Sequence, residues 1–153
     1  MVFVSVGTQK QDFSRIFKLV ENSKVLENEE IIGQSGYTKY ESKKIKLIPF
    51  IKKDEFATYF DNADIIICHG GVGTIFDGLY KKKKVLAVPR FAKYKEHVND
   101  HQIQICKKLQ EEGYILYLDD GEDIDKKLEI LKNTTFKEYV IDESYLDILR
   151  KQI

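Results

Sequence analysis

The sequence predicts an α/β fold, with a Rossmann-like parallel sheet that has helices on both faces. Short runs of strand-forming residues alternate along the chain with segments whose apolar residues recur at helical spacing. Near the middle, an apolar strand at 65–68 is followed by a glycine-rich turn and an apolar helix at 72–80, as in a crossover between parallel strands. The length of 153 residues suits one domain over 1–153.

In the first half of the chain, short apolar runs and helical spacing indicate the other elements. Strands are expected at 2–6, 30–33 and 45–48. A helix after the first strand is indicated by the apolar residues Phe13, Ile16, Phe17 and Val20. A second, short helix is expected to bury Phe56, Tyr59 and Phe60. Asp12 and Asp54 precede these two segments and are the expected N-caps.

In the second half, a strand is expected at 85–88, preceded by four lysines at 81–84 that suit a solvated helix C-terminus better than a nucleic-acid patch. A helix at 98–112 would end at Gly113. One face of this helix would carry Val98, Gln102, Ile105 and Leu109. A strand at 115–118 and an amphipathic helix at 123–131 follow. Residues 133–153 are expected to form a C-terminal helical extension, because Tyr145, Leu146, Leu149 and Ile153 have near-helical spacing.

The composition excludes several classes of function. Basic and acidic residues balance at 25 each, so no broad attraction to nucleic acid or to an anionic membrane is expected. No apolar run approaches the ~20 residues that cross a bilayer, and the N-terminal residues do not resemble a signal peptide. Cys68 and Cys106 match no zinc or disulfide spacing, which suits a reducing compartment. A cytoplasmic location is therefore expected.

The glycine-rich turn after the central strand is the candidate functional site. Three glycines follow His69 within four positions, namely Gly70, Gly71 and Gly73. They let the backbone bend sharply and approach a ligand, and the N–H groups of the following helix would favour an anion such as a diphosphate. Thr74 can add a hydroxyl donor, and Asp77 lies where a carboxylate could bind the hydroxyls of a ribose. A turn with a purely structural role is the alternative.

Three segments give the chain a resemblance to a known family. They are the opening 3–9 (FVSVGTQ), the central 69–74 (HGGVGT) and 96–102 (EHVNDHQ). In this order and spacing they resemble the C-terminal, donor-binding half of GT-B glycosyltransferases of the MurG type. The likeness is greatest to free-standing halves: PssE-like subunits of bacterial exopolysaccharide transferases and the cytosolic subunit of the eukaryotic dolichol-linked N-acetylglucosaminyltransferase. The fold implied is a GT-B C-terminal-type, nucleotide-sugar-binding domain.

The resemblance also implies roles for individual residues. His69, the three glycines, Thr74 and Thr8 would bind the donor diphosphate. Asp77 would bind the ribose, although the family commonly has glutamate there. Phe50 would lie against the uracil, and Glu96 and Gln102 would contact the sugar. His97 and His101 have a spacing that could bind a metal, but no third ligand is evident, so neither a metal nor another cofactor is expected.

The function implied is that of a donor-binding subunit in a two-component, inverting glycosyltransferase. It would transfer a sugar from a UDP-sugar to a lipid-linked acceptor in exopolysaccharide or capsule synthesis. A membrane-anchored, PssD-like partner would bind the acceptor and supply the general base, so no catalytic residue is assigned to this chain. The chain would be peripheral at the inner face of the membrane through that partner, and inactive or weak alone.

Two alternatives remain open at this point. The chain could be a non-catalytic enhancer that stabilises a partner glycosyltransferase with its own donor site; such a subunit would not need to bind UDP. It could also be a dinucleotide-binding oxidoreductase, but Phe76 stands where the third glycine of that fingerprint belongs, and this alternative ranks last.

Overall fold

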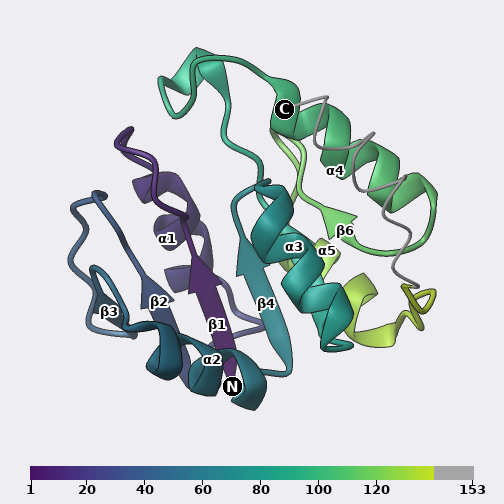
Figure 1. The fold of residues 1–153 in the computed structure, drawn as a ribbon, viewed down its shortest axis with the longest axis horizontal. Coiled ribbons are helices and arrows are strands. Elements are labelled where there is room, and N and C mark those ends of the chain that lie inside the picture. Colours follow the sequence, from purple (N-terminus) through teal and green to yellow (C-terminus); the bar gives the residue numbers. More distant parts are fainter. Residues whose placement is uncertain (140–153) are drawn as a thin grey trace.

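Six strands form one parallel sheet within residues 1–139, the part of the chain that this computed structural model describes (Figure 1). They are β1 (Val2–Ser5), β2 (Ile31–Gln34), β3 (Ile45–Ile48), β4 (Ile65–Cys68), β5 (Lys84–Ala87) and β6 (Leu116–Tyr117). Their order across the sheet is β3-β2-β1-β4-β5-β6, and every pair is parallel. The order reverses between β1 and β4, and ligands of open parallel sheets bind at such a point.

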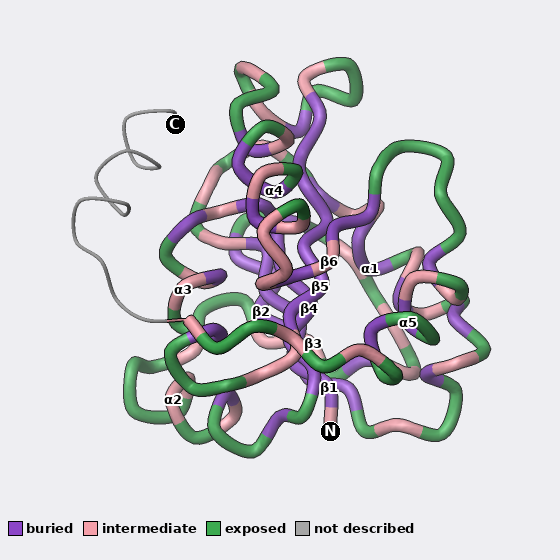
Figure 2. The backbone as a smooth tube through the Cα atoms, turned by 90° about the vertical axis from the view of Figure 1, so that its right-hand side faces the viewer, coloured by how far each residue is buried: buried purple, intermediate pink, exposed green. Residues whose placement is uncertain are grey.

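Helices cover both faces of this sheet. They are α1 (Ser14–Glu21), α2 (Lys53–Asn62), α3 (Val72–Tyr80), α4 (His101–Glu111) and α5 (Ile124–Asn133), with a short 3₁₀ helix at Ala92–Tyr94. Apolar side chains of α1 and α5 belong to one core layer, and those of α2, α3 and α4 belong to the other. Figure 2 shows the buried strands running through the centre, with exposed loops around them. The predicted α/β architecture is confirmed.

The alternation of side chains along the strands explains the two layers. Val2 and Val4 of β1 point into the layer of α1 and α5, whereas Phe3 points into the opposite layer. Each of these three side chains is at most 1% exposed. Strands buried on both faces are continuously apolar, which is why residues 65–67 are three isoleucines.

Several predicted boundaries were wrong, most clearly the start of α4. Val98 is 79% exposed and lies before the helix, which begins at His101. The reason is that the side chains of Asn99 and Asp100 hydrogen-bond to backbone groups. Asn99 Oδ1 accepts from the His101 N–H, 3.0 Å away, and Asp100 Oδ1 accepts from the Ala92 N–H of the preceding 3₁₀ helix, 2.9 Å away. Such bonds favour a turn over a helix.

The two predicted N-caps are also wrong, the first by one residue and the second by two. Asp12 accepts a hydrogen bond from the Ser14 N–H, but the N-cap position of α1 is Phe13, whose own N–H donates to Thr38. Asp54 lies in the first turn of α2, where its charge favours the helix dipole, and the N-cap is Lys52. Of the expected C-terminal extension, α5 reaches Asn133, residues 134–139 have no regular secondary structure, and 140–153 lie outside the described residues.

Candidate functional site

A crevice opens at the carboxyl ends of β1 and β4, where the strand order reverses. Ser5 pairs with Cys68 in the sheet, so the loops that follow these two strands leave the same edge side by side. The crevice has a volume of about 380 Å³. Its lining residues come from the β1 loop, the end of β2, α2, and the turn into α3: Ser5, Gly7, Thr8, Gln9, Gln34, Phe56, His69, Gly71, Gly73 and Thr74. Five of the residues predicted for the diphosphate therefore lie together.

The imidazole of His69 is held between two glycines from different loops. A Cβ atom at residue 71 would lie 2.0 Å from Cε1 of the ring, and one at residue 7 would lie 2.5 Å from Nε2. Gly7 also has a φ of +76°, which side-chain-bearing residues rarely adopt. The His69 N–H donates to the Ser5 carbonyl, 3.0 Å away, as β1 and β4 end. The ring position is thus set by the sheet and by both loops.

Burial and neighbouring charges make His69 a neutral imidazole. Only 9% of the residue is exposed, and within residues 1–139 its Nδ1 atom has no hydrogen-bond partner. Burial, and then the nearby charges of Arg90 and His97, lower the pKa of His69 to about 4. His69 lines the crevice, and a buried ring nitrogen without a partner is suited to hydrogen bonding with a ligand.

The first turn of α3 offers backbone N–H groups at the same place. Gly71 is the N-cap residue, with an extended backbone, and its position provides no side-chain cap for the helix. A Cβ atom at Gly73 would meet nothing within 4 Å, so the backbone there faces open space. Uncapped N–H groups and the positive end of a helix dipole are suited to binding an anion. The hydroxyl of Thr74 lies in the same turn and lines the crevice.

Arg90 connects the loops around the crevice. Its guanidinium is fully buried and donates to the carbonyl oxygens of Val6 at 2.8 Å, Gln11 at 2.8 Å and Glu96 at 2.9 Å. Val6 and Gln11 lie at either end of the loop that carries Gly7, Thr8 and Gln9. The pKa of Arg90 is lowered to about 10, mainly by burial, so the guanidinium remains charged at neutral pH. Arg90 therefore joins the β1 loop to the segment that contains Glu96.

Glu96 and Gln102, the two residues predicted to contact the sugar, are buried and engaged with protein groups. The Glu96 carboxylate accepts hydrogen bonds from Arg15 at 2.9 and 3.0 Å, and from the Phe91 N–H at 3.0 Å. The Gln102 side chain accepts one from the Arg90 N–H at 3.2 Å. Neither residue lines the crevice. Their assignment to the sugar stays a prediction.

Gly70, Asp77 and Phe50 also lie outside the crevice lining. A Cβ atom at Gly70 would lie 2.8 Å from Cβ of Gln102, so this glycine allows α4 to approach the turn. Asp77 is exposed on α3, one turn beyond the crevice residues of that helix. Phe50 is 54% exposed and packs edge-to-face on Tyr37, with 5.2 Å between the ring centroids.

The other five lining residues were not assigned to the site from the sequence. Gln34 and Phe56 were not identified as site residues, and Ser5, Gly7 and Gln9 were quoted only as part of a motif. The position of Gln34 at the end of β2 was a usable signal, since the carboxyl ends of parallel strands share one edge. The side chain of Gln34 also accepts a hydrogen bond from the Ile51 N–H, 2.9 Å away, which connects β2 to the loop after β3.

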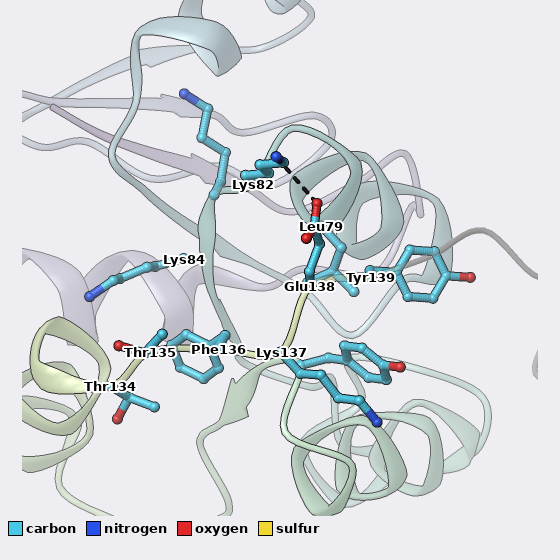
Figure 3. Close-up of a pocket in the computed structure, with 11 residues that line it drawn as sticks. Leu79, Lys82, Lys84, Thr134, Thr135, Phe136, Lys137, Glu138 and Tyr139 are labelled. Carbon is cyan, nitrogen blue, oxygen red and sulfur yellow. Dashed lines mark ion pairs between the residues drawn. The ribbon is translucent and has the colours of Figure 1, made fainter.

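A second cavity, of about 350 Å³, lies near the amino end of β5, away from the crevice. Figure 3 shows the residues that line it. It is lined by Leu79 and Lys82 near the end of α3, by Tyr114, and by residues 134–139. Lys82 forms an ion pair with Glu138 there, drawn as a dashed line in Figure 3. Within the described residues no group of three or more metal-binding side chains is found, and no helix is both long and apolar enough to cross a membrane.

The chain is similar in sequence to known transferase subunits. It is 22% identical over 116 residues to UDP-N-acetylglucosamine transferase subunit ALG13 of Candida albicans, and 26% identical over 129 residues to the protein of that name in Mus musculus. Each alignment covers 75% of this chain. The chain spans 37% of the Candida protein and 10% of the mouse protein, so it corresponds to a part of each.

The fold is similar to solved glycosyltransferase structures. A solution structure of ALG13 superposes with a TM-score of 0.63 at 21% identity, covering 97% of this chain and 94% of that one. The glycotransferase of kitacinnamycin superposes with a TM-score of 0.65 at 14% identity, covering 99% of this chain and 37% of that one. These likenesses confirm the predicted GT-B type of fold.

The family follows from a match over almost the whole sequence. Residues 1–142 match the family described as glycosyltransferase family 28 C-terminal domain. The match includes the β1 loop, the turn into α3 and the segment before α4, which are the three segments that carried the resemblance in the sequence. The chain belongs to the glycosyltransferase family 28 C-terminal domain family.

Proposed function

We propose that this chain is the donor-binding subunit of a two-component, inverting glycosyltransferase that uses a UDP-sugar. The observation that carries the proposal is the crevice, in which the neutral imidazole of His69 and the uncapped N-terminus of α3 converge between Gly7 and Gly71. The family assignment supports glycosyl transfer and argues against the oxidoreductase alternative. The names of the similar proteins, UDP-N-acetylglucosamine transferase subunits, support a UDP-sugar as donor.

The diphosphate would bind with its oxygens against the first turn of α3. Backbone N–H groups at 71–74 and the Thr74 hydroxyl would donate to it, with Thr8 facing them across the crevice. Asp77, exposed further along α3, would bind the ribose, and Phe50 would lie against the uracil. No metal is required in this proposal, because the helix N-terminus and donor groups meet the charge of the diphosphate.

In the reaction, an acceptor hydroxyl would attack the anomeric carbon in line as UDP departs toward α3. Negative charge grows on the leaving diphosphate, and preorganised N–H donors stabilise it; removing one donor of this kind typically costs ~2.7–4 kcal/mol in the transition state. Among the described residues 1–139, no carboxylate lines the crevice to act as general base. The base would come from the acceptor-binding partner.

That partner would be a membrane-anchored, PssD-like subunit that presents a lipid-linked acceptor at the cytoplasmic face of the membrane. The chain would be peripheral to the membrane through this subunit, in exopolysaccharide or capsule synthesis. The similar proteins are named as subunits of a transferase, which supports this division of labour. Neither nucleic acid nor a resident cofactor enters the proposal.

Titration of the isolated chain with UDP, followed by calorimetry, tests the proposal. We expect saturable binding that weakens at least tenfold in Gly71→Val, because losing hydrogen bonds to a charged group is worth about 1.5–3 kcal/mol. Lys18→Met, on an exposed position of α1, is the matched control and should bind as the parent does. Absence of UDP binding, combined with stimulation of a co-expressed partner transferase, would favour a non-catalytic enhancer instead.

A further inference from the structure

Within residues 1–139 the crevice contains an imidazole but no acidic side chain that could balance a positive charge on it. The lining groups around His69 are hydroxyls, amides, glycines and one aromatic ring. The nearby carboxylate of Glu96 is bound to Arg15 and the Phe91 N–H instead. An imidazolium at residue 69 would therefore have no counter-ion among these groups.

The charged and titratable groups near His69 come from the residues after β5, from the loop before α4, and from α4 itself. Arg90 follows β5 and is cationic, and His97 lies in the loop before α4; both disfavour a positive charge on the ring. Beneath the turn, Cys106 of α4 stays a neutral thiol, because burial raises its pKa. From β1 and its loop the lining groups are Ser5, Thr8 and Gln9, which are uncharged.

We infer that His69 takes up a proton from solvent when a diphosphate enters the crevice, so that the ligand supplies the counter-ion that the imidazole lacks. The inference rests on the proposed function and deepens it, because it specifies how the site compensates the charge of its ligand. In the imidazolium both ring nitrogens donate, and Nδ1, which has no partner in the described chain, gains an acceptor.

Close packing by Gly7 and Gly71 around the ring of His69 strengthens the protonation expected on ligand binding. Side-chain rotation could carry a free histidine away from an unfavourable charge, but Gly7 and Gly71 lie too close to the ring of His69 for it to turn easily. The ring therefore meets the ligand in a fixed position with little water around it. In such surroundings an opposite charge within about 4–6 Å strongly favours the charged form of a titratable group.

As a consequence, the affinity of the crevice for a diphosphate depends on pH. Without ligand the pKa of His69 is about 4, and bound diphosphate raises it. The bound state then holds more protons than the free state at pH values between the two pKa values, so the affinity rises as the pH falls through that window, by at most ~10-fold per pH unit. Release of UDP would return the proton to solvent.

Calorimetric titration of UDP at about pH 6 in MES and in Bis-Tris, whose ionisation enthalpies differ, measures the protons taken up. The parent chain and His69→Gln are compared, since the proton equilibrium of UDP itself contributes equally to both. We expect the parent to take up ~0.5 proton more per bound UDP than His69→Gln. His101→Gln, which changes an exposed histidine, should keep the proton uptake of the parent.

The outcomes of this experiment distinguish a failure of the inference from a failure of the proposed function. If the parent binds UDP and takes up no more protons than His69→Gln, this inference is overturned while the donor site stands. If the parent does not bind UDP, the proposed function falls and the inference falls with it. Should His69→Gln bind too weakly to measure, NMR titration of the His69 ring in the parent replaces it: a pKa that UDP raises supports the inference, and an unchanged pKa overturns it.

Discussion

The imidazole of His69 occupies the space that any side chain at residue 71 would need, since a Cβ atom there would lie 2.0 Å from Cε1 of the ring. His69 and Gly71 lie two residues apart, directly after β4. The histidine supplies a polar ring to the site, and the glycine leaves room for that ring. Gly7, in the β1 loop, also leaves room for this ring. The site therefore depends on packing between two loops as much as on the N-terminus of α3.

Gly71→Ala and Gly73→Ala should have opposite effects on stability. The new methyl group at residue 71 displaces His69, and overpacking of this kind costs about 1–3 kcal/mol in the free energy of unfolding. The methyl group at residue 73 meets open space in the first turn of α3, so it should add ~0.5–1 kcal/mol through helix propensity. Urea unfolding measures both. Equal stabilities for the two variants would show that the ring of His69 does not pack tightly against residue 71.

Loss of Arg90 should be among the most damaging single changes in the chain. Arg90→Met leaves the carbonyls of Val6, Gln11 and Glu96 without their donor, and each buried unsatisfied group costs about 1–3 kcal/mol. Arg90→Lys should also be destabilised, because one ammonium cannot reach three carbonyls in the guanidinium geometry. Urea unfolding is again the measurement. A fully stable Arg90→Lys would mean that charge alone matters at this position.

The Arg15–Glu96 ion pair should contribute far more than an exposed pair. Glu96 has a side chain only 5% exposed and accepts two hydrogen bonds from Arg15, whereas Lys82 and Glu138 are 76% and 72% exposed. A double-mutant cycle with Arg15→Met and Glu96→Gln should give a coupling free energy of about 1.5–3 kcal/mol. The same cycle on Lys82 and Glu138 should give less than ~1 kcal/mol. Similar values for the two cycles would contradict the structure.

The depressed pKa of His69 should make the fold less stable in acid. In the unfolded chain a histidine has a pKa near 6.5, so between pH 6.5 and about 4 the unfolded state binds more protons than the folded state. The contribution of His69 is fully present above pH 6.5 and is lost as the pH falls toward 4; it amounts to about 3 kcal/mol. His69→Gln should therefore show a flatter dependence of unfolding free energy on pH. Parallel curves for parent and variant would exclude a neutral, buried His69.

The sheet was predictable because its signals are local. The isoleucines at 65–67, the turn into α3 and the parallel crossover can all be read from neighbouring residues. The proximity of Thr8 and His69 was predictable for a related reason: parallel strands bring their carboxyl ends to one edge, so the loops after β1 and β4 had to lie close. The start of α4 was not predictable, since Val98 fits the helical spacing and only hydrogen bonds to Asn99 and Asp100 side chains exclude it.

The roles of Glu96 and Arg90 depend on long-range contacts that no local pattern shows. Glu96 stands in a polar segment that suggested contact with a sugar, but Arg15, 81 residues earlier, binds its carboxylate. Arg90 directly follows β5 and Pro89 in the sequence, yet its guanidinium donates hydrogen bonds to carbonyls of the distant β1 loop. Pairings between distant residues of this kind become visible only once the two loops are placed in space.

The most direct test of the central claim is an NMR titration of the isotope-labelled chain with UDP, which reports the position of the nucleotide residue by residue. The account predicts that the largest chemical-shift changes fall on the amides of Gly7, Thr8 and residues 71–74. Unchanged spectra at saturating UDP, or changes confined to the cavity between Lys82 and Glu138, would contradict it.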